Sequence, residues 1–324
     1  FVPKVENNTV GVSWSGDKVD GEFIDLDKFY VAKPGDSVAK INSQLNAGKN
    51  LILTPGIYSL DAPIEIKNED TIVLGLGYAT LKPTNGNECM KVADVGGVSI
   101  AGVLFDAGRN KSSTLLTVGT EKNTNDNSDN PICLIDTFYR VGGADSTPGK
   151  TTNCVVINSN NVIGDNFWIW RADHGDNTGW YENTANSALV VNGDYVTGYG
   201  LFIEHFQKHD VLWRGEYGKT FFLQNEKCYD PQKQEEWMSH NNTVKGYAAY
   251  KVSNNVKHHY AVGLGVYDVF IYTNGASIFL DNAIEVPNAD GVLIENACIV
   301  EIANGEGPNV GINNIINGTC PGIT

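Results

Sequence analysis

Positive charge is scarce in this sequence. The 324 residues include 23 Lys and Arg against 38 Asp and Glu, which gives a formal net charge of −15 at pH 7. Such a surface repels other anions, so the balance argues against nucleic acid, polyuronates and anionic membrane surfaces as partners. It is compatible with a neutral partner.

Long apolar runs and a leader segment are also missing. No run of about 18 apolar residues occurs, so we expect no membrane-spanning helix. The chain begins at Phe1 with neither Met nor a signal peptide, and we therefore expect a mature, processed form. No CxxC pair and no Gly-rich phosphate loop is present, and we expect neither a metal nor a cofactor.

Six cysteines and four Asn-x-Ser/Thr sequons favour a secreted, extracellular protein. Proximity suggests disulfides between Cys133 and Cys154 and between Cys298 and Cys320, with free buried cysteines as the alternative. The sequons lie in polar stretches where glycans are tolerated, at Asn7, Asn110, Asn241 and Asn317.

One segment has the pattern of a helix. In "PGDSVAKINSQLNAGKN", Asp36 or Ser37 can cap the N-terminus, and Val38, Ile41 and Leu45 recur at helical spacing before Gly48. We expect a helix over residues 37–46 that covers the first coil of a larger β structure, where an open strand edge would otherwise invite aggregation.

The rest of the chain repeats a short apolar cadence. A polar pair opens each unit, and apolar residues then alternate around a small residue, as in "NLILTPGIYSL", "DTIVLGLGYATL", "GGVSIAGVLFDAG", "NNVIGDNFWIW", "DYVTGYGLFIEHF", "GKTFFLQNE", "NNVKHHYAVGLGVY" and "DGVLIENACIVEI". Stacked units of this kind bury a continuous core, and Asn-rich corners suit left-handed backbone angles. The cadence predicts an all-β chain, a right-handed single-stranded parallel β-helix, with a β-sandwich as the rival.

We expect one domain, residues 1–324. Within it we expect an N-terminal extension (1–30), the capping helix region (31–50), the rungs (51–316) and a tail (317–324).

The stretch 31–107 carries a family resemblance. It contains "VAKPGDSVAKINSQLNAGKNLILTPGIYSLDAPIEI", "TIVLGLGYATL" and "VSIAGVLFDAG", and it resembles the first coils of pectate-lyase-like β-helix proteins. The chain is similar in architecture to secreted fungal and bacterial β-helix glycoside hydrolases, among them 1,3-glucanases. It departs from polygalacturonase-like enzymes, because it has no Asp-Asp pair.

Chemistry-bearing residues gather in the middle of the chain. All six histidines lie between His174 and His259, and five of six tryptophans lie between Trp168 and Trp237. Successive rungs of a β-helix stack about 4.8 Å apart, so equivalent positions form a row on one face. Aligning the apolar runs brings Trp170 to Asp173, Glu204 with His205, and Gln224 to Glu226 near one another.

A carbohydrate site explains this mixture best. Sugar rings stack on aromatic faces, and glycoside hydrolysis requires two carboxyl groups, one acid and one base or nucleophile. We expect Asp173, Glu204 and Glu226 to be the catalytic candidates, although Asp173 could instead only close a turn. The substrate-binding candidates are Trp170, Arg171, His174, Trp180, His205, Trp213 and Gln224.

The favoured function is hydrolysis of a neutral polysaccharide or oligosaccharide by a secreted monomer. The family resemblance implies a 1,3-linked cell-wall glucan. Two alternatives stay open. One is a polysaccharide lyase acting on a uronate-containing glycan, which would need basic groups that are scarce near the cluster. The other is a glycan-binding solenoid without catalysis, which needs the aromatic side chains but not matched carboxylates.

Overall fold

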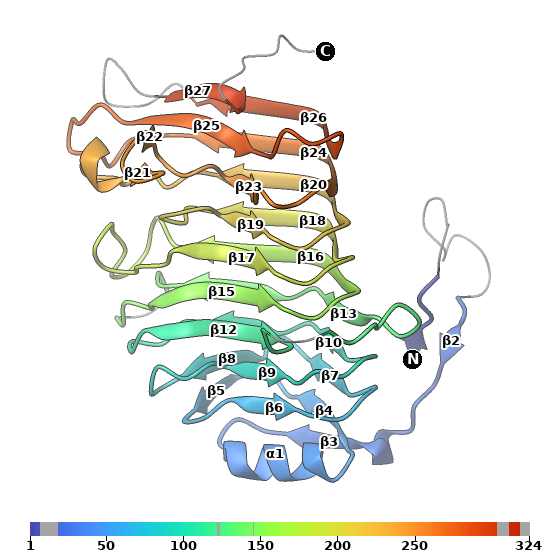
Figure 1. Cartoon of the computed structure of the whole chain (residues 1–324). Helices are drawn as coiled ribbons and strands as arrows, with labels where there is room; N and C mark the ends of the chain where they lie inside the picture. Colours follow the sequence, from blue (N-terminus) through green and yellow to red (C-terminus); the bar gives the residue numbers. More distant parts are fainter. Residues whose placement is uncertain (7–18, 122–123, 145, 303–310, 318–324) are drawn as a thin grey trace.

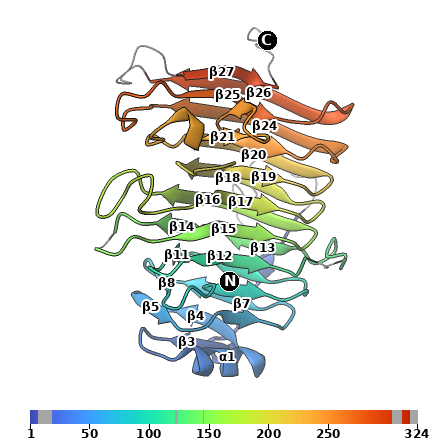
Figure 2. The ribbon, with the colours of Figure 1, turned by 60° about the vertical axis from the view of Figure 1, so that its left-hand side comes forward.

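Parallel strands stacked along one axis form the body of the molecule. The computed structural model describes residues 1–6, 19–121, 124–144, 146–302 and 311–317. Figure 1 shows the strands ascending from α1 and β3 at one end to β26 and β27 at the other, and the turned view of Figure 2 shows the same order. Every pairing within the two large sheets is parallel, which excludes the antiparallel sandwich.

A 14-stranded sheet and a 9-stranded sheet contain most of these strands. The first comprises β3 (Phe29–Ala32), β4 (Asn50–Leu53), β5 (Ile57–Leu60), β7 (Ile72–Gly75), β8 (Thr80–Pro83), β10 (Ser99–Ala101), β11 (Leu104–Asp106), β13 (Ile132–Ile135), β14 (Phe138–Val141), β16 (Val162–Arg171), β18 (Thr197–Glu204), β20 (Gly218–Glu226), β24 (His258–Asp268) and β26 (Gly291–Glu301). The second comprises β6 (Ile64–Ile66), β9 (Met90–Val92), β12 (Ser112–Val118), β15 (Thr151–Ile157), β17 (Ser187–Val191), β19 (Val211–Trp213), β23 (Tyr250–Val252), β25 (Phe279–Glu285) and β27 (Gly311–Ile316).

Two short antiparallel pairs lie outside this stack. They are β1 (Val2–Pro3) with β2 (Gly21–Glu22), and β21 (Met238–Ser239) with β22 (Val244–Lys245). Short 3₁₀ turns occur at η2 (Leu26–Lys28) and η3 (Gln234–Glu236).

The alternation of the sequence builds the core. Leu51 and Leu53 of β4 are fully buried, while Asn50 and Ile52, which alternate with them, are only partly buried. In parallel register, Leu51 pairs with Val73 of the next coil, so apolar side chains stack above one another inside the coil. The repeated units expected from the sequence are therefore the coils of this structure.

A bend divides each of the long strands. Asn166 in β16, Gly200 in β18, Phe222 in β20 and Gly263 in β24 have φ of 57°, 58°, 72° and 73°. Before its bend β16 pairs with β13, and after it with β14. The Asn166 amide donates to Asp136 Oδ1 at 2.6 Å, so polar side chains ladder along this corner. The strand segments beyond the bend lead to the candidate site.

Helix α1 (Val38–Asn46) forms where the sequence predicts it. Ser37 is the N-cap, and its hydroxyl accepts a hydrogen bond from the Lys40 backbone N–H. Val38, Ile41 and Leu45 are buried, and the helix packs against β3, β4 and β6. The structure adds one feature that the pattern did not indicate, because strand β3 precedes the helix and pairs with β4.

The expected Cys133–Cys154 disulfide is wrong. Both cysteines are free thiols. Cys133 alternates with inward-facing Ile132 and Leu134 on β13, so its side chain points out of the coil, whereas Cys154 on β15 is fully buried in the core. Cys298 is free and exposed, and its proposed partner Cys320 lies outside the described residues.

The sequons occupy different settings. Asn110, Asn241 and Asn317 are exposed, and Asn7 lies outside the described residues. The Asn110 amide already donates to Thr84 O, and the Asn317 amide donates to Val286 O. Within the described part of the chain, no helix is long and apolar enough to cross a membrane.

Candidate active site

A row of outward-facing residues forms near the ends of four long strands. Trp170 of β16 pairs in register with Glu204 of β18, Glu204 with Glu226 of β20, and Glu226 with Tyr267 of β24. Parallel register places equivalent side chains about 4.8 Å apart. The structure thus brings two of the expected catalytic carboxylates together on neighbouring strands.

Glu204 is adapted to hold a proton. Partial burial raises the pKa of its carboxyl to about 7, and the negative charges of Glu226 and then Asp173 act in the same direction. The indole N–H of Trp168 donates to Glu204 Oε2 at 3.4 Å and opposes this rise. A carboxylic acid that is still half protonated at neutral pH can serve as a general acid.

Hydrogen-bond donors surround Glu226. Gln224 Nε2 donates to Glu226 Oε1 at 3.1 Å, and the Tyr229 hydroxyl donates to Glu226 Oε2. Burial, followed by the Glu226 contact, raises the pKa of Tyr229, so its hydroxyl remains a donor at neutral pH. Both oxygens of Glu226 thus accept a side-chain hydrogen bond beside Glu204.

Asp173 belongs to the same cluster. Its Oδ1 accepts a hydrogen bond from Trp170 Nε1 at 3.3 Å and lies 2.8 Å from His174 Nδ1. The same oxygen is 3.6 Å from Nε2 of His205, whose other carboxylate neighbour is Glu226 at 3.8 Å. Asp173 therefore does more than close a turn, because its carboxylate is directed at the site.

Stacked tryptophans border the carboxylates. The rings of Trp168 and Trp170 lie 5.5 Å apart with an interplanar angle of 14°, and Trp168 is 44% exposed. Alternation along β16 puts both side chains on the outer face of the sheet. They offer an aromatic surface next to Glu204, as a carbohydrate site requires.

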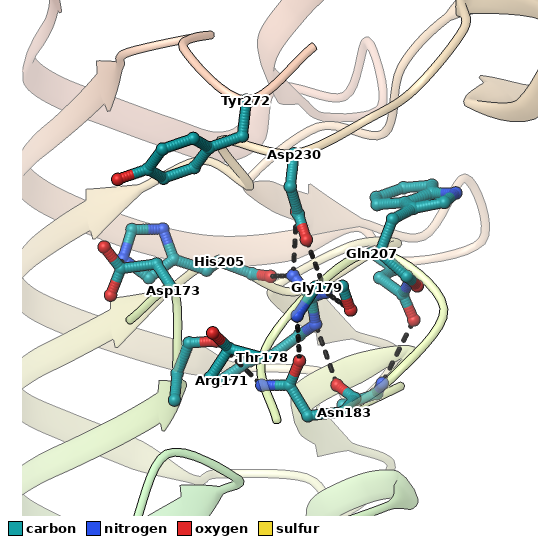
Figure 3. A network of polar contacts seen from close by, with 12 residues as sticks. Arg171, Asp173, Thr178, Gly179, Asn183, His205, Gln207, Asp230 and Tyr272 are labelled. Atoms are coloured by element: carbon teal, nitrogen blue, oxygen red, sulfur yellow. Dashed lines mark hydrogen bonds and ion pairs between the residues drawn. The ribbon is translucent and has the colours of Figure 1, made fainter. Parts of the chain in front are cut away.

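Arg171 lies beneath this surface, in the network of Figure 3. Its guanidinium forms a bidentate pair with Asp230, at 3.0 and 2.8 Å, and donates to the backbone carbonyls of Gly179, Asn183 and His205. All five of its N–H groups are used, which compensates the cost of burying the charge. Arg171 thus ties the loops that follow three successive strands.

The structure corrects three of the expected substrate contacts. Arg171 is fully buried, and its ion-pair partner is Asp230 instead of Asp173. Trp180 is 8% exposed and packs over the Arg171 guanidinium, while Trp213 is a core residue against Tyr250. None of these three side chains forms part of a surface groove, because all three are buried.

The remaining expected residues are at the site. Trp170 and Gln224 are partly exposed and His174 is largely exposed, so all three are accessible to a ligand. His205 is 2% exposed and faces Asp173 and Glu226 from the protein side. It contacts the carboxylates and is not open to solvent.

Sequence reasoning missed Trp168, Tyr229 and Asp230. Trp168 could have been found, since it is two residues before Trp170 and alternation puts both on one face. Tyr229 and Asp230 gave no local signal, because their partners Glu226 and Arg171 meet them only through the folded loop. Among the described residues, no group of three or more His, Cys, Asp or Glu side chains is arranged to hold a metal ion.

A stack of parallel coils is the architecture of pectate-lyase-like β-helix proteins, a fold on which different active sites can be built. The family model of the LAM55 pectate lyase-like domain matches residues 29–226, and the chain belongs to that family. The resemblance inferred from residues 31–107 is thereby confirmed.

Two proteins of known type are similar to this chain along its whole length. An exo-β-1,3-glucanase of Streptomyces sp. (strain SirexAA-E / ActE) is 44% identical over 324 residues, which are 100% of this chain and 52% of that protein. The structure of sacteLam55A from Streptomyces sp. SirexAA-E superposes with a TM-score of 0.92 at 43% identity, covering 98% of this chain and 56% of that one. A glutamate-to-alanine variant of sacteLam55A, in complex with glucose, gives a TM-score of 0.90 at 42% identity, covering 97% of this chain and 55% of that one. The chain thus spans about half the length of these relatives.

Proposed function

We propose that this chain carries the catalytic carboxylates of a glycoside hydrolase that cleaves β-1,3-linked glucan. The observation that carries the proposal is the register pairing of Glu204 with Glu226, one carboxyl with a raised pKa and one surrounded by donors. The similarity to an exo-β-1,3-glucanase supports the linkage and release of sugar from a chain end.

The chemistry requires one proton on the pair. One carboxyl donates its proton to the glycosidic oxygen as the bond to the sugar breaks, and the other carboxylate stabilises or activates the attacking group. In the free protein the proton rests on Glu204, whose pKa is about 7. The charge of Glu226 contributes to the raised pKa of Glu204, so the two carboxyls act as one acid–base unit.

Substrate binding is assigned to the outer face beside this pair. Trp168 and Trp170 present their rings to a sugar, and Gln224 and His174 offer polar groups at the edges. Neutral glucan also suits the excess of acidic residues, because it carries no charge to be repelled.

An assay on a panel of glycans tests this function. The chain is incubated with soluble β-1,3-glucan, α-1,3-glucan, mannan, galactan and polyuronate, and both reducing ends and unsaturated uronate absorbance are measured. We expect glucose from β-1,3-glucan alone. Unsaturated uronate would establish the lyase alternative, and binding without any turnover would establish the non-catalytic solenoid.

The remaining features of the proposal concern the molecule around the site. We infer that the coils wind in the right-handed sense usual for parallel crossovers and that α1, packed on β3, β4 and β6, covers the first coil. We also propose a secreted monomer, supported by its net charge of −15 and its sequons. Loss of mass from the peptides that contain Asn110 and Asn241 after enzymatic deglycosylation tests whether these sequons carry glycans. Light scattering tests whether the protein is a monomer.

A further inference from the structure

A groove with a volume of about 650 Å³ lies on a face of the molecule that the candidate active site does not use. It follows the outer face of the 9-stranded sheet, whereas Glu204 and Glu226 belong to the 14-stranded sheet. Figure 1 shows the strands beneath the groove, β6, β9, β12, β15 and β17, one above another. Cavities that bind small ligands occupy about 300–1,000 Å³, so this groove has the size of a binding site.

The floor of the groove is a row of side chains in parallel register. Lys91 of β9 pairs with Thr117 of β12, and Thr117 pairs with Val156 of β15. Val190 of β17 continues the row and is only 5% exposed, although alternation along its strand turns it outward. Neighbouring coils lie about 4.8 Å apart, so these four positions span about 14 Å. The floor is therefore a straight strip, polar at one end and apolar at the other.

A chain of hydrogen bonds holds the wall that follows the ends of these strands. Arg214 donates from Nη1 to Asn192 Oδ1 at 3.1 Å, and Asn192 Nδ2 donates to Asn158 Oδ1 at 2.7 Å. The Asn158 amide donates in turn to Gly119 O at 2.9 Å. Because each side chain is held by the next, the wall keeps its shape before a ligand binds, which reduces the entropy lost on binding.

The opposite wall, near the starts of the strands, has an unsatisfied acceptor. Glu88 Oε1 accepts from Ser113 Oγ at 3.5 Å and lies 3.6 Å from Lys91 Nζ. Glu88 Oε2 is buried and has no hydrogen-bond partner among the residues that the structure describes. A buried carboxylate oxygen without a donor is costly, and a ligand that donates a hydrogen bond there supplies the missing contact. The groove therefore favours a ligand that carries hydrogen-bond donors.

The charge of the groove narrows the chemistry of that ligand. Among the described residues, its lining has three acidic and three basic side chains, Glu65, Glu88, Glu121, Lys67, Lys91 and Arg214. The whole chain has 38 acidic residues against 23 basic ones, so this face is balanced within an acidic protein. The other polar side chains described in the lining are hydroxyls and amides, among them Thr117, Thr152 and Asn153. Neither a strongly charged nor a wholly apolar ligand matches such a lining, whereas a neutral polyhydroxylated chain does.

We propose that this groove is a second binding site, which holds a neutral glycan chain away from the catalytic carboxylates. The choice of β-1,3-glucan as that glycan rests on the proposed function. A sugar hydroxyl donates to Glu88 Oε2, and the C–H face of a ring packs on Val156 and Val190. A polysaccharide held there stays on the protein while its chain ends reach the carboxylates, so their effective concentration at the catalytic pair rises.

Affinity electrophoresis in gels that contain soluble β-1,3-glucan measures this binding without turnover. All proteins carry Glu226→Gln, which keeps the glucan intact. Val156→Arg fills the floor with a long side chain and should lower the retardation several-fold. Glu88→Gln replaces an acceptor oxygen and should lower it by about fivefold, the effect of one lost hydrogen bond. The matched controls, Leu293→Arg and Glu69→Gln, change exposed positions outside the groove and should leave the retardation unchanged.

Kinetics separates the groove from the catalytic site. With Glu226 intact, Val156→Arg should raise KM on polymeric β-1,3-glucan several-fold. It should leave kcat/KM on a short β-1,3-linked oligosaccharide unchanged, because a short chain cannot occupy both faces of the protein at once. An equal change on both substrates would place the effect of Val156→Arg at the catalytic site and would overturn the proposal.

The glutamate variant decides the binding result. Glu88→Gln keeps the shape of the side chain, so retardation equal to that of Glu69→Gln would overturn the groove as a glycan site, whatever Val156→Arg does to folding. Stronger retardation by polyuronate than by β-1,3-glucan would contradict a neutral ligand. Groove-dependent retardation without hydrolysis of any glycan would overturn the proposed function alone. Hydrolysis with unchanged retardation in both groove variants would overturn the groove alone.

Discussion

Glu204 is the direct register partner of Glu226 across strands β18 and β20, so two successive coils present one carboxylate each at the same height of the outer face. Burial raises the pKa of Glu204, and the negative charge of Glu226 on the neighbouring strand raises it further. The fold itself, through parallel register, therefore prepares the acid–base pair.

Amide substitutions test the carboxylates. Glu204→Gln and Glu226→Gln should each lower kcat on β-1,3-glucan by about 100-fold or more, because shape is kept and proton transfer is lost. Asp173→Asn should have a smaller effect, since Asp173 contacts Trp170 and His174 and lies outside the register pair of Glu204 and Glu226. Thermal midpoints should stay near that of the unchanged protein. Near-normal turnover in all three would show that the cluster is a binding surface.

The proton on Glu204 also affects stability. The folded pKa of Glu204, about 7, lies above the ordinary glutamate pKa of 4.5, so its contribution to stability is fully present below about pH 4.5 and is lost as pH rises through 7. Glu204→Gln removes this titration. The free energy of unfolding of the variant, relative to that of the unchanged protein, should therefore rise by about 1–2 kcal/mol from pH 5 to pH 8. Urea unfolding at both values measures it, with exposed Glu69→Gln as control. Equal pH dependence in the Glu204 variant and the unchanged protein would contradict the raised pKa.

Trp168 should have two separable roles. Trp168→Phe keeps an aromatic face but removes the N–H that lowers the pKa of Glu204, so the alkaline limb of kcat/KM should move to higher pH. Trp168→Ala also removes the face and should raise KM about tenfold. A full pH profile of both variants on soluble glucan measures this. An unmoved limb in Trp168→Phe would show that the hydrogen bond to Glu204 does not act in solution.

Backbone strain at the bend of the long strands can be measured by exchanging glycine and non-glycine residues at equivalent positions. Phe222 and Gly200 occupy equivalent corner positions, with φ of 72° and 58°. Gly200→Ala should lower the free energy of unfolding by about 1 kcal/mol, because a residue with a Cβ is strained at this positive φ. The added Cβ would not clash, since the nearest atom is 3.9 Å away. Phe222→Gly should raise the free energy of unfolding by roughly 0.5–1 kcal/mol, because glycine relieves the same strain. The loss of the ring contact with Phe202 reduces this gain. Denaturant midpoints of the two variants are compared, and a loss of stability in Phe222→Gly would place the ring contact above backbone strain.

The sequence by itself determined the coils and the helix. Alternation in "NLILTPGIYSL" and the Ser37 cap before Val38, Ile41 and Leu45 are local signals, and local propensity agrees with the final packing there. Even the row of Glu204 and Glu226 followed from aligning repeated units, because parallel coils convert equal sequence position into equal spatial position.

Only the tertiary structure decided how buried charged and aromatic side chains are compensated, which alternation along a strand does not encode. Trp170 and Arg171 are adjacent in sequence, yet the first faces the site and the second is fully buried. Burying a guanidinium is tolerable only with partners such as Asp230 and three backbone carbonyls, and two of these partners, Asp230 and the His205 carbonyl, come from later coils. Trp213 likewise enters the core because Tyr250 and His259 surround it there. Such compensation is a property of non-local contacts, and no local pattern in the chain encodes it.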